Sequence, residues 1–403
     1  MSKKTPDGIV PLKEIRDGYI MSLSLGSPSQ TIHNLFLSTG SDLVWVHCGN
    51  LSNPFECIDC TDPYNKKYNF SFFNPSSSKS ISSEPCTSPL CADIHTSDYY
   101  NTCTAAGCVL RDFVNVKCSK PCPSFSYSYV DGSVAGFLAN DTIVLNANNQ
   151  HNTKQYISFG CVRSSYRMPL GIVGFGKGPL SLLSQLGFLE NGFAYCFLSF
   201  EFSSNPNFTP ILENPTYPNF YYVGLESVTV GNKVNIQAPE SLRVFSPSGK
   251  GTMMIDSSTS NTHLPDPLYS QLQEAIKSMV KYSRASDVEA KSPFHLCYHV
   301  PTKYAKKPGG FPSITFHFLN NVSLNLPAGN VFYKVAPPKN GSQPVCLIMQ
   351  EMDDDEVEAS AVLGSFQQQN IEVVYDLQNE RIGFQTTDCV SYGKRYGIRM
   401  DIN

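Results

Sequence analysis

The chain reads Phe36-Leu37-Ser38-Thr39-Gly40-Ser41 in its first half and Met254-Ile255-Asp256-Ser257-Ser258-Thr259 in its second half. Both runs have two apolar residues, then a small polar residue, a hydroxyl residue, a small residue and another hydroxyl residue. Each run is followed later by an apolar-apolar-Gly element, which is Ile172-Val173-Gly174 in the first half and Val362-Leu363-Gly364 in the second. Because this two-part pattern occurs once in each half, the sequence predicts an internal repeat.

The segments that precede both runs are predicted to be β-strands. Residues 19–26 alternate between polar and apolar side chains and end in a Gly-Ser-Pro turn, and residues 220–231 alternate in the same way. Helical patterns are short: residues 179–186 have start and stop signals, and residues 267–282 place apolar side chains on one helix face. We therefore expect an all-β fold, mainly β-strands with a few short helices.

The length of 403 residues favours two domains, because a single hydrophobic core rarely serves more than about 250–300 residues. We expect an N-terminal extension over residues 1–18, an N-terminal β lobe over residues 19–207 and a C-terminal β lobe over residues 208–403. The N-terminal lobe contains a cysteine-dense insertion over residues 48–122.

The composition excludes two classes of partner. Lys and Arg number 30 and Asp and Glu number 34, so the chain has no basic surplus to neutralise phosphates, and we expect no nucleic-acid partner. No window approaches the ~20 apolar residues of a membrane-spanning helix, so we expect no membrane span.

Fourteen cysteines indicate disulfide bonds and an oxidising compartment. The only C-x-x-C motif is Cys57-Ile58-Asp59-Cys60, and no second ligand pair follows at zinc-finger spacing, so we expect no metal and no cofactor. The N-terminus lacks the apolar stretch of a signal peptide, and we expect that this segment is missing from the sequence. N-x-S/T sequons agree with a secreted glycoprotein and begin at Asn50, Asn69, Asn140, Asn207, Asn321 and Asn340.

Several motifs in order carry a family resemblance. The run from Leu37 to Val46 resembles the signature of pepsin-like aspartic peptidases, which normally begins Asp-Thr-Gly, and residues 127–133 resemble the flap of that family. The plant nepenthesin-like branch is the most similar in the cysteine-dense insertion and in residues 171–181, 364–370 and 373–376. The resemblance extends from Tyr19 to Cys389. It implies a bilobal pepsin-like acid protease fold with a central peptide-binding cleft.

The resemblance also implies a reaction that needs two carboxylates, one from each repeat. The ionised carboxylate takes a proton from a water molecule, and the protonated one donates a hydrogen bond to the scissile carbonyl. The second repeat supplies Asp256, but the first repeat has Ser38 at the matching position. The family glycine is kept as Gly40 in the first repeat and replaced by Ser258 in the second, where a side chain is expected to crowd the site.

A serine hydroxyl does not act as a general base near neutral or acidic pH, so we expect a catalytically inactive or strongly impaired peptidase. An engineered change or a sequence error at Ser38 is the alternative, and the independent departure at Ser258 argues against it. Serine catalysis by Ser38 is not supported, because the chain has no G-x-S-x-G motif.

Other residues match supporting positions of the family. Thr39 and Ser257 match the hydroxyls that brace the two loops, and Ser41 and Thr259 follow them. For Asp256 itself, the alternative to a catalytic role is a strand-end carboxylate that accepts hydrogen bonds from its own turn.

The flap is expected at Tyr129, with Asp131 and Gly132 at its hairpin tip. Trp45 matches the residue whose indole N–H bonds the flap phenol in the family. Plain core packing of Trp45, the only tryptophan, is an equally good interpretation.

The cysteine count predicts the disulfide pattern. With a lobe boundary near residues 205–216, the first lobe has eleven cysteines and the second has three, so both counts are odd. If every cysteine is oxidised, an odd number of bridges must join the lobes, and the best candidate is Cys196 with Cys389. Cys297 with Cys346 would then staple the second lobe, and five bridges would remain in the first.

The leading hypothesis is an inactive, secreted pepsin-like homologue that binds a peptide or protein in its cleft. Plant relatives with broken dyads include inhibitors of microbial glycosidases, which makes a defence role plausible by analogy. The alternatives are a functional aspartic endopeptidase with weak or altered activity, and a structural or decoy domain without a ligand. We expect a monomer that is extracellular, in the apoplast or cell wall, or vacuolar.

Overall fold

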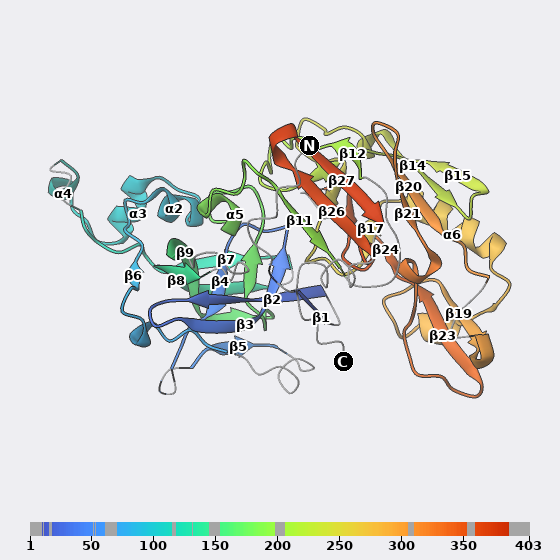
Figure 1. The fold of residues 1–403 in the computed structure, drawn as a ribbon, viewed down its shortest axis with the longest axis horizontal. Coiled ribbons are helices and arrows are strands. Elements are labelled where there is room, and N and C mark those ends of the chain that lie inside the picture. Colours follow the sequence, from blue (N-terminus) through green and yellow to red (C-terminus); the bar gives the residue numbers. More distant parts are fainter. Residues whose placement is uncertain are drawn as a thin grey trace. The chain divides into compact units, whose positions relative to one another are not determined.

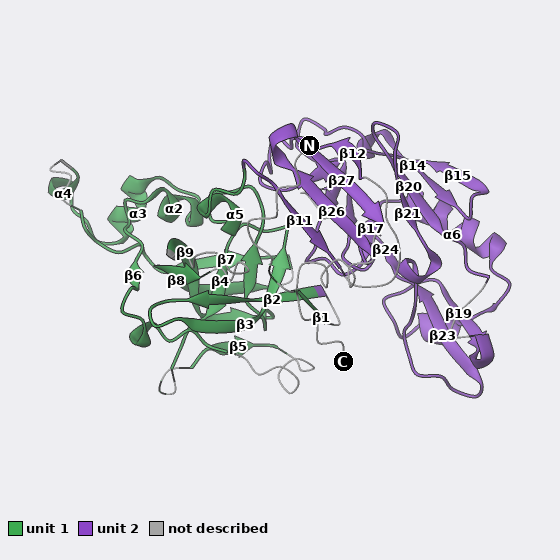
Figure 2. Ribbon diagram, viewed as in Figure 1, with its two compact units in different colours: residues 1–15, 19–189 green, residues 16–18, 190–403 purple. Residues whose placement is uncertain are grey.

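The computed structural model describes residues 10, 12–15, 18–50, 52, 54–60, 71–114, 118–130, 132–144, 154–197, 206–304, 310–352 and 359–386. The chain divides into two compact units, of which unit 1 comprises residues 1–15 and 19–189 and unit 2 comprises residues 16–18 and 190–403 (Figure 2). Both are built mainly of β-strands with short helices, as predicted.

The division falls at residues 189 and 190, whereas the sequence placed the lobe boundary at 207 and 208. The reason is β11 (Phe193–Cys196), which pairs antiparallel with β26 (Ile371–Asp376) and therefore belongs to unit 2. Part of the expected N-terminal extension is also regular structure, because β1 (Lys13–Ile15) forms one edge of the unit 1 sheet.

Unit 1 contains one large sheet (Figure 1). Its remaining strands are β2 (Gly18–Leu25), β3 (Gln30–Ser38), β4 (Trp45–His47), β5 (Glu56–Ile58), β6 (Ser82–Ser83), β7 (Phe125–Ser128), β8 (Ser133–Val144), β9 (Lys154–Tyr166) and β10 (Ile172–Gly174). The sheet has the order β1-β2-β3-β10-β4-β9-β8-β6, while β5 also pairs with β9 and β7 also pairs with β8. Its body is the long antiparallel pair of β8 and β9.

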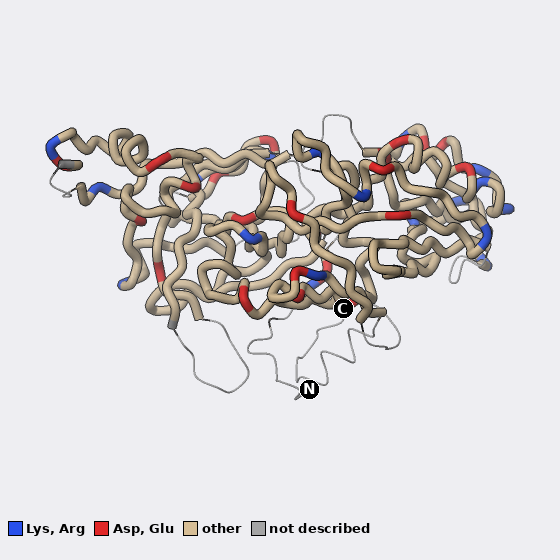
Figure 3. Tube along the Cα trace, turned by 90° about the horizontal axis from the view of Figure 1, so that it is seen from above, with Lys and Arg blue, Asp and Glu red and all other residues tan. Residues whose placement is uncertain are grey.

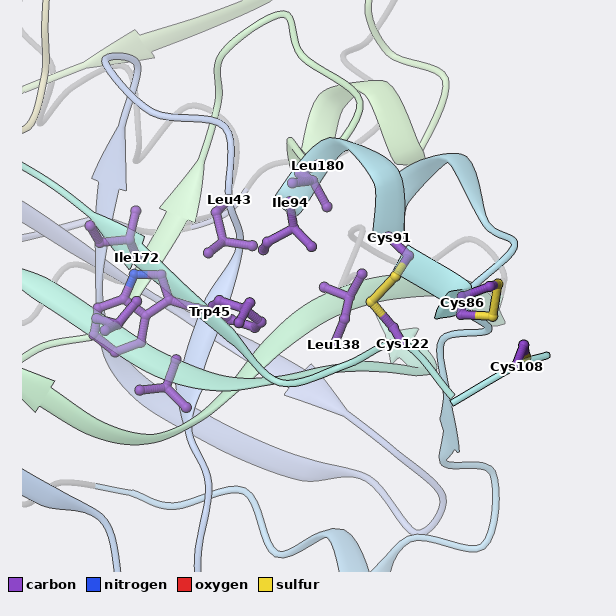
Figure 4. Packing of buried hydrophobic residues seen from close by; sticks show 14 residues of the cluster. Leu43, Trp45, Cys86, Cys91, Ile94, Cys108, Cys122, Leu138, Ile172 and Leu180 are labelled. Carbon is purple, nitrogen blue, oxygen red and sulfur yellow. A yellow bond between two sulfur atoms is a disulfide. The ribbon is translucent and has the colours of Figure 1, made fainter. Parts of the chain in front are cut away.

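The cysteine-dense insertion adds short helices to unit 1, which are α2 (Pro89–Ile94), α3 (Tyr99–Ala105) and α4 (Leu110–Val114); α5 (Leu182–Gln185) lies beyond β10. The side chain of Ser88 caps α2 by accepting from Leu90 N, and Asp98 caps α3 by accepting from Asn101 N. The disulfides Cys91–Cys122 and Cys86–Cys103 join these helices to a buried cluster that includes Trp45 (Figure 4).

Unit 2 distributes its strands over four sheets. Its other strands are β12 (Asn207–Pro210), β13 (Tyr222–Val223), β14 (Leu225–Val230), β15 (Val234–Gln237), β16 (Met253–Ile255), β17 (Thr262–Leu264), β18 (Ser283–Arg284), β19 (Cys297–Pro301), β20 (Ile314–Phe318), β21 (Val322–Leu326), β22 (Phe332–Lys334), β23 (Ser342–Leu347), β24 (Met349–Glu351), β25 (Ala361–Leu363) and β27 (Arg381–Thr386). Its helices are α6 (Leu268–Met279) and α7 (Ser286–Glu289). The apolar face predicted for residues 267–282 is the face that α6 buries, through Leu268, Leu272, Ala275 and Ile276.

The internal repeat is confirmed by the strand pairings of the two units. Unit 1 contains the strand order β2-β3-β10-β4-β9, and unit 2 contains β13-β16-β25-β17-β24. Along each series the successive pairs are antiparallel, parallel, antiparallel and parallel. Each repeated apolar-apolar-Gly element therefore lies parallel to the strand that leads into the repeated hydroxyl loop.

Acidic and basic residues both occur in each unit (Figure 3), which agrees with the nearly balanced charge of the sequence. Among the residues that the structure describes, no helix has the length and apolar character needed to cross a membrane.

Each disulfide whose two cysteines are both described lies within one unit. Unit 1 has five bridges, which are Cys48–Cys161, Cys57–Cys60, Cys86–Cys103, Cys91–Cys122 and Cys108–Cys118. In unit 2 the predicted pair Cys297 and Cys346 is bonded. Cys196 is also disulfide-bonded, and its predicted partner Cys389 lies outside the described residues.

The predicted bridge between lobes does not follow from this division. Because Cys196 belongs to unit 2, unit 1 has ten cysteines and unit 2 has four, which together account for all fourteen. Both counts are even, so complete oxidation no longer requires a disulfide that joins the two units. The odd cysteine counts depended on placing β11 and Cys196 in the first lobe, and the pairing of Cys196 with Cys389 stays a prediction.

Candidate active site

The two repeated loops begin at the ends of matching strands. β3 ends at Ser38, and Asp256 follows β16 directly. The parallel partner strands place Gly174 opposite Ser38 and Leu363 opposite Ile255. Backbone hydrogen bonds continue these pairings, from Phe175 N to Ser38 O at 2.7 Å and from Asp256 N to Leu363 O at 3.2 Å.

Each apolar-apolar-Gly element needs its glycine because the backbone of the adjacent loop passes very close. A Cβ atom on Gly174 would lie 2.0 Å from the carbonyl oxygen of Asp42. A Cβ atom on Gly364 would lie 2.4 Å from the carbonyl carbon of Asn261. These separations are far below van der Waals contact, so the repeated glycines are required by the fold of the loops.

In the second repeat, the carboxylate of Asp256 is held by its own turn. Its Oδ1 accepts hydrogen bonds from the backbone N–H of Ser258 at 2.9 Å and from the Ser258 hydroxyl at 2.8 Å. Its Oδ2 accepts from the hydroxyl of Thr259 at 2.6 Å. Asp256 is buried, and only 5% of the residue is exposed. Both of its carboxylate oxygens accept hydrogen bonds.

Ser258 affects this site through a hydrogen bond as well as through its size. The sequence suggested that a side chain in place of glycine would crowd the carboxylate. In the structure the extra hydroxyl instead donates to Asp256, which adds a donor that a glycine cannot supply. The turn geometry also matches the alternative interpretation of Asp256 as a carboxylate that bonds its own turn.

In the first repeat, the matching position has no carboxylate. Ser38 and Thr39 are buried, and the loop is tied to the segment after β10 by a hydrogen bond from Gly178 N to Asp42 Oδ1 at 2.9 Å. Ser41 occupies the position that Thr259 has in the second repeat. Its buried hydroxyl has no hydrogen-bond partner among the described residues. The carboxylate that accepts from Thr259 in the second repeat therefore has no counterpart at Ser38 in the first.

The predicted flap is a hairpin. β7 and β8 pair directly, and the intervening turn is closed by a hydrogen bond from Tyr129 N to Gly132 O at 2.7 Å. Asp131, predicted at the tip, lies outside the described residues. Gly132 fits because a Cβ atom there would lie 2.2 Å from the backbone oxygen of Tyr166.

Tyr129 packs against the buried cluster that contains Trp45. Burial raises the pKa of the Tyr129 hydroxyl well above 10.0, Tyr127 adds to the increase, and the Trp45 indole acts in the opposite direction. Among the described residues, neither the Tyr129 hydroxyl nor the Trp45 indole N–H makes an ordinary hydrogen bond. Trp45 therefore has both a core position and a place beside the flap tyrosine.

Two further residues support the loops and were not predicted as site residues. Gln368 is fully buried, and its amide donates to the backbone oxygens of Asp256 at 3.3 Å and Leu363 at 2.8 Å. Asp42 anchors the first loop in the opposite sense, because its Oδ1 accepts a hydrogen bond from Gly178 N. Both residues lie inside motifs that carried the family resemblance, and that resemblance could have identified them as part of the site. Ser257, like Thr39, is fully buried.

Metal binding by cysteine is not available in this state of the protein. The described groups with suitable spacing consist of Cys86, Cys103, Cys108 and Cys118, and of Cys91, His95 and Cys122. All of these cysteines are in disulfide bonds, so none offers a free thiolate.

Comparison with protein families places these features in a known class. The model described as "Xylanase inhibitor N-terminal" matches residues 19–209, and the model described as "Xylanase inhibitor C-terminal" matches residues 220–386. The fold is also that of two solved structures. Basic 7S globulin from soybean aligns with a TM-score of 0.62 and 19% identity over 94% of this chain and 96% of its own. The protein named edgp aligns with a TM-score of 0.64 and 18% identity over 95% of each chain.

These matches define the class as pepsin-like in fold. Among named relatives, a probable aspartyl protease of Arabidopsis thaliana is 34% identical, over 93% of this chain and 82% of its own length. The aspartic proteinase nepenthesin-1 of Nepenthes gracilis is 28% identical, over 95% of this chain and 81% of its own. The chain therefore belongs to the nepenthesin-like family of plant aspartic peptidases.

Proposed function

We propose that this chain is a catalytically inactive member of the family that binds a peptide or protein segment. The observation that carries the proposal is the difference between the two repeats. Matching strands lead to a carboxylate, Asp256, in unit 2 and to a hydroxyl, Ser38, in unit 1. Family chemistry requires one carboxylate from each repeat.

The loss of one carboxylate removes a step that the remaining residues do not replace. Asp256 is the only carboxylate of the pair. It cannot both take a proton from the water molecule and donate a hydrogen bond to the scissile carbonyl. General acid–base catalysis by one positioned group accelerates a reaction by about 10²–10⁴. When several groups act together, removal of one of them lowers the rate by more than that group's own factor. We therefore expect peptide cleavage below the background of a standard assay.

The arrangement around Asp256 supports the same conclusion. Oδ1 accepts two hydrogen bonds from Ser258, and Oδ2 accepts one from Thr259, so donors of its own turn already engage both oxygens. The donor from the Ser258 hydroxyl has no counterpart in a site with glycine at that position.

The proposed ligand is a protein, and the class that we favour is a microbial glycosidase that attacks cell walls. Support comes from the family models, whose descriptions name xylanase inhibitors and which together match most of the chain. This role requires export, and the disulfides in both units suit an extracellular or vacuolar setting. Within each unit, the elements that we propose for peptide binding are the hydroxyl loop and, in unit 1, the flap hairpin.

Peptide cleavage at acidic pH tests the proposal. The unaltered chain is compared with Ser38→Asp, with the double variant Ser38→Asp/Ser258→Gly, and with Asp256→Ala as the background control. We expect the unaltered chain to match Asp256→Ala, and the repaired variants to cleave. Cleavage by the unaltered chain that Asp256→Ala abolishes would overturn the proposal in favour of a weakly active endopeptidase, the function that the names of the relatives suggest.

Binding is measured separately. Purified glycosidases are titrated with the unaltered chain, and inhibition of their hydrolysis is followed. Inhibition that persists in Asp256→Ala supports a role independent of catalysis. Absence of binding to a broad set of cell-wall glycosidases would contradict this ligand class while leaving the inactive dyad unaffected.

A further inference from the structure

We propose that Asn321 and Asn340 carry N-linked glycans and that Asn140 does not. This assignment rests on the export included in the proposed function, because N-glycans are added in the secretory pathway. It goes further by selecting, among sequons of identical chemistry, those whose amide nitrogen can hold a glycan in the folded protein.

Asn321 lies at the tip of the hairpin between β20 and β21. Asn320 and Asn321 have φ values of 64° and 56°, in the left-handed region that asparagine tolerates better than most residues. The residue is exposed, and its side chain makes no hydrogen bond to the described residues. The hydroxyl residue of its sequon, Ser323, is exposed on β21, opposite His317.

Asn340 lies at a similar tip, before β23. The turn is closed by hydrogen bonds from Lys339 N to Ser342 O at 2.8 Å and from Ser342 N to Lys339 O at 3.0 Å. Asn340 has a φ of 50° and is exposed, and Gly341 beside it has no side chain that could cover the amide. A glycan on either tip extends into solvent without displacing any described contact.

Asn140 has the opposite environment, although its sequon is equally complete. It lies within β8, between Ser82 of β6 and Ser158 of β9. Its Nδ2, the atom that would bear a glycan, donates to the hydroxyl of Ser158 at 3.1 Å. Ser158 is fully buried and in turn donates to Glu84, which is also buried. Asn140 is half-buried, and a glycan on this nitrogen would crowd its contact with Ser158 and the buried Ser158–Glu84 pair, so we expect no glycan there in the folded protein.

The remaining described sequons are intermediate and are not part of the proposal. Asn50 is exposed, but its Oδ1 accepts from Ser52 N at 3.0 Å. Asn207 is exposed on β12, which pairs with β27, and the hydroxyl residue of its sequon, Thr209, is buried.

The modification is a group transfer from a lipid-diphosphate-linked oligosaccharide. The amide nitrogen of the asparagine forms a bond to the first sugar carbon, the bond from that carbon to the lipid diphosphate breaks, and one amide proton leaves. The exporting cell supplies the donor and the transferase.

The test uses the full chain with an added signal peptide, secreted from a eukaryotic host. Because export is then provided, failure of the glycan assignment is distinguishable from failure of the proposed function. The secreted protein is treated with peptide-N-glycosidase in ¹⁸O-water, which converts each occupied asparagine into labelled aspartate that mass spectrometry locates. We expect label at Asn321 and Asn340 and none at Asn140.

Sequon variants separate glycosylation from turn stability. Ser323→Ala and Ser342→Ala destroy the sequons but keep the asparagines that the turns require, and Ser323→Thr and Ser342→Thr are the matched controls that keep the sequons. Each alanine variant is expected to lose one glycan step in gel mobility, and each threonine variant to lose none. Unlabelled Asn321 or Asn340, or labelled Asn140 in folded protein, would overturn the proposal.

Discussion

Ser41 and Thr259 occupy the same position in the two repeats, but their hydroxyl groups have different partners. Thr259 donates to Asp256 Oδ2 at 2.6 Å, whereas the buried hydroxyl of Ser41 finds no acceptor among the described residues. A buried polar group without a partner costs about 1–3 kcal/mol. The first repeat therefore keeps the hydroxyl donor, Ser41, but Ser38 supplies no carboxylate that could accept its hydrogen bond.

Stability measurements should reveal this difference between the repeats. Thr259→Val removes a hydrogen bond to a carboxylate and is expected to cost about 1–3 kcal/mol. Ser41→Ala removes a buried hydroxyl without a partner among the described residues and is therefore expected to raise the free energy of unfolding, by up to about 1–3 kcal/mol. In a Ser38→Asp background, Ser41→Ala should become destabilising, because the new carboxylate gives the hydroxyl an acceptor. Denaturant unfolding of the unaltered chain, Thr259→Val, Ser41→Ala, Ser38→Asp and Ser38→Asp/Ser41→Ala checks this, and equal effects of Ser41→Ala in both backgrounds would contradict it.

His47 gives the chain a pH dependence that is unrelated to the dyad. Its ring is buried on β4 and stacks on Phe55 with ring centroids 3.9 Å apart. Burial lowers the pKa of His47 from 6.5 to about 4, and a hydrogen bond with the backbone of Pro169 opposes this shift. Because the unfolded chain binds this proton more readily, His47 contributes its full stability above pH 6.5, and that contribution is lost as the pH falls towards about 4.

The expected loss between about pH 7 and pH 4 is on the order of 3 kcal/mol from this residue alone. A His47→Gln variant should lack this part of the acid sensitivity, although it is less stable at neutral pH. The measurement is the free energy of unfolding of both chains at several pH values. Parallel pH profiles for the two chains would show that His47 does not titrate in this range.

At the level of elements, the recurring unit is a strand, a hydroxyl loop and a parallel glycine-ended strand. Gly364 and Gly174 let the loop backbone approach more closely than any side chain would permit. Backbone hydrogen bonds then fix the loop, and buried amides such as that of Gln368 add to them.

Gly364→Ala is expected to destabilise unit 2 by about 1–3 kcal/mol or more, because its Cβ would overlap the backbone of Asn261. Gly329→Ala is the matched control, since no atom lies within 4 Å of its added Cβ. The control should remain within about 0.5 kcal/mol of the unaltered chain. Thermal unfolding of both variants provides the comparison, and similar midpoints would show that the close approach can relax without cost.

The repeated elements were predictable from the sequence because their pattern depends on local chemistry. Alternation, hydroxyls and glycines at fixed offsets located β3, β16 and their partner strands, and the apolar face of α6 was also visible. The position of β11 was not predictable, because its pairing with β26 joins residues about 180 positions apart, such as Phe193 and Tyr375. The donors to Asp256 from Ser258 and Thr259 likewise depend on side-chain rotamers, which a sequence pattern does not specify.

For the molecule as a whole, the disulfides follow the division into units. All ten cysteines of unit 1 are paired with one another, and Cys297 is paired with Cys346 in unit 2. Because the other twelve cysteines are paired, the remaining pair is Cys196 with Cys389, and both belong to unit 2.

Peptide mapping without reduction should therefore recover seven linked pairs, none of which joins residues 1–189 to residues 190–403. The expected linked peptides include Cys196 with Cys389. Recovery of a peptide from unit 1 linked to Cys196 or Cys389 would refute the division, and a free thiol at both positions would refute the pair.

The way in which Ser38 is attached to its sheet has a consequence for what this architecture tolerates. The bonds that hold its strand end, from Phe175 N and along the β3–β10 pair, involve the backbone, as do those of Asp256 with Leu363. A substitution at residue 38 can therefore end a reaction without weakening the sheet. On the proposed function, the two departures at Ser38 and Ser258 leave the repeated scaffold intact, so the surface of the chain is free to diversify for recognition.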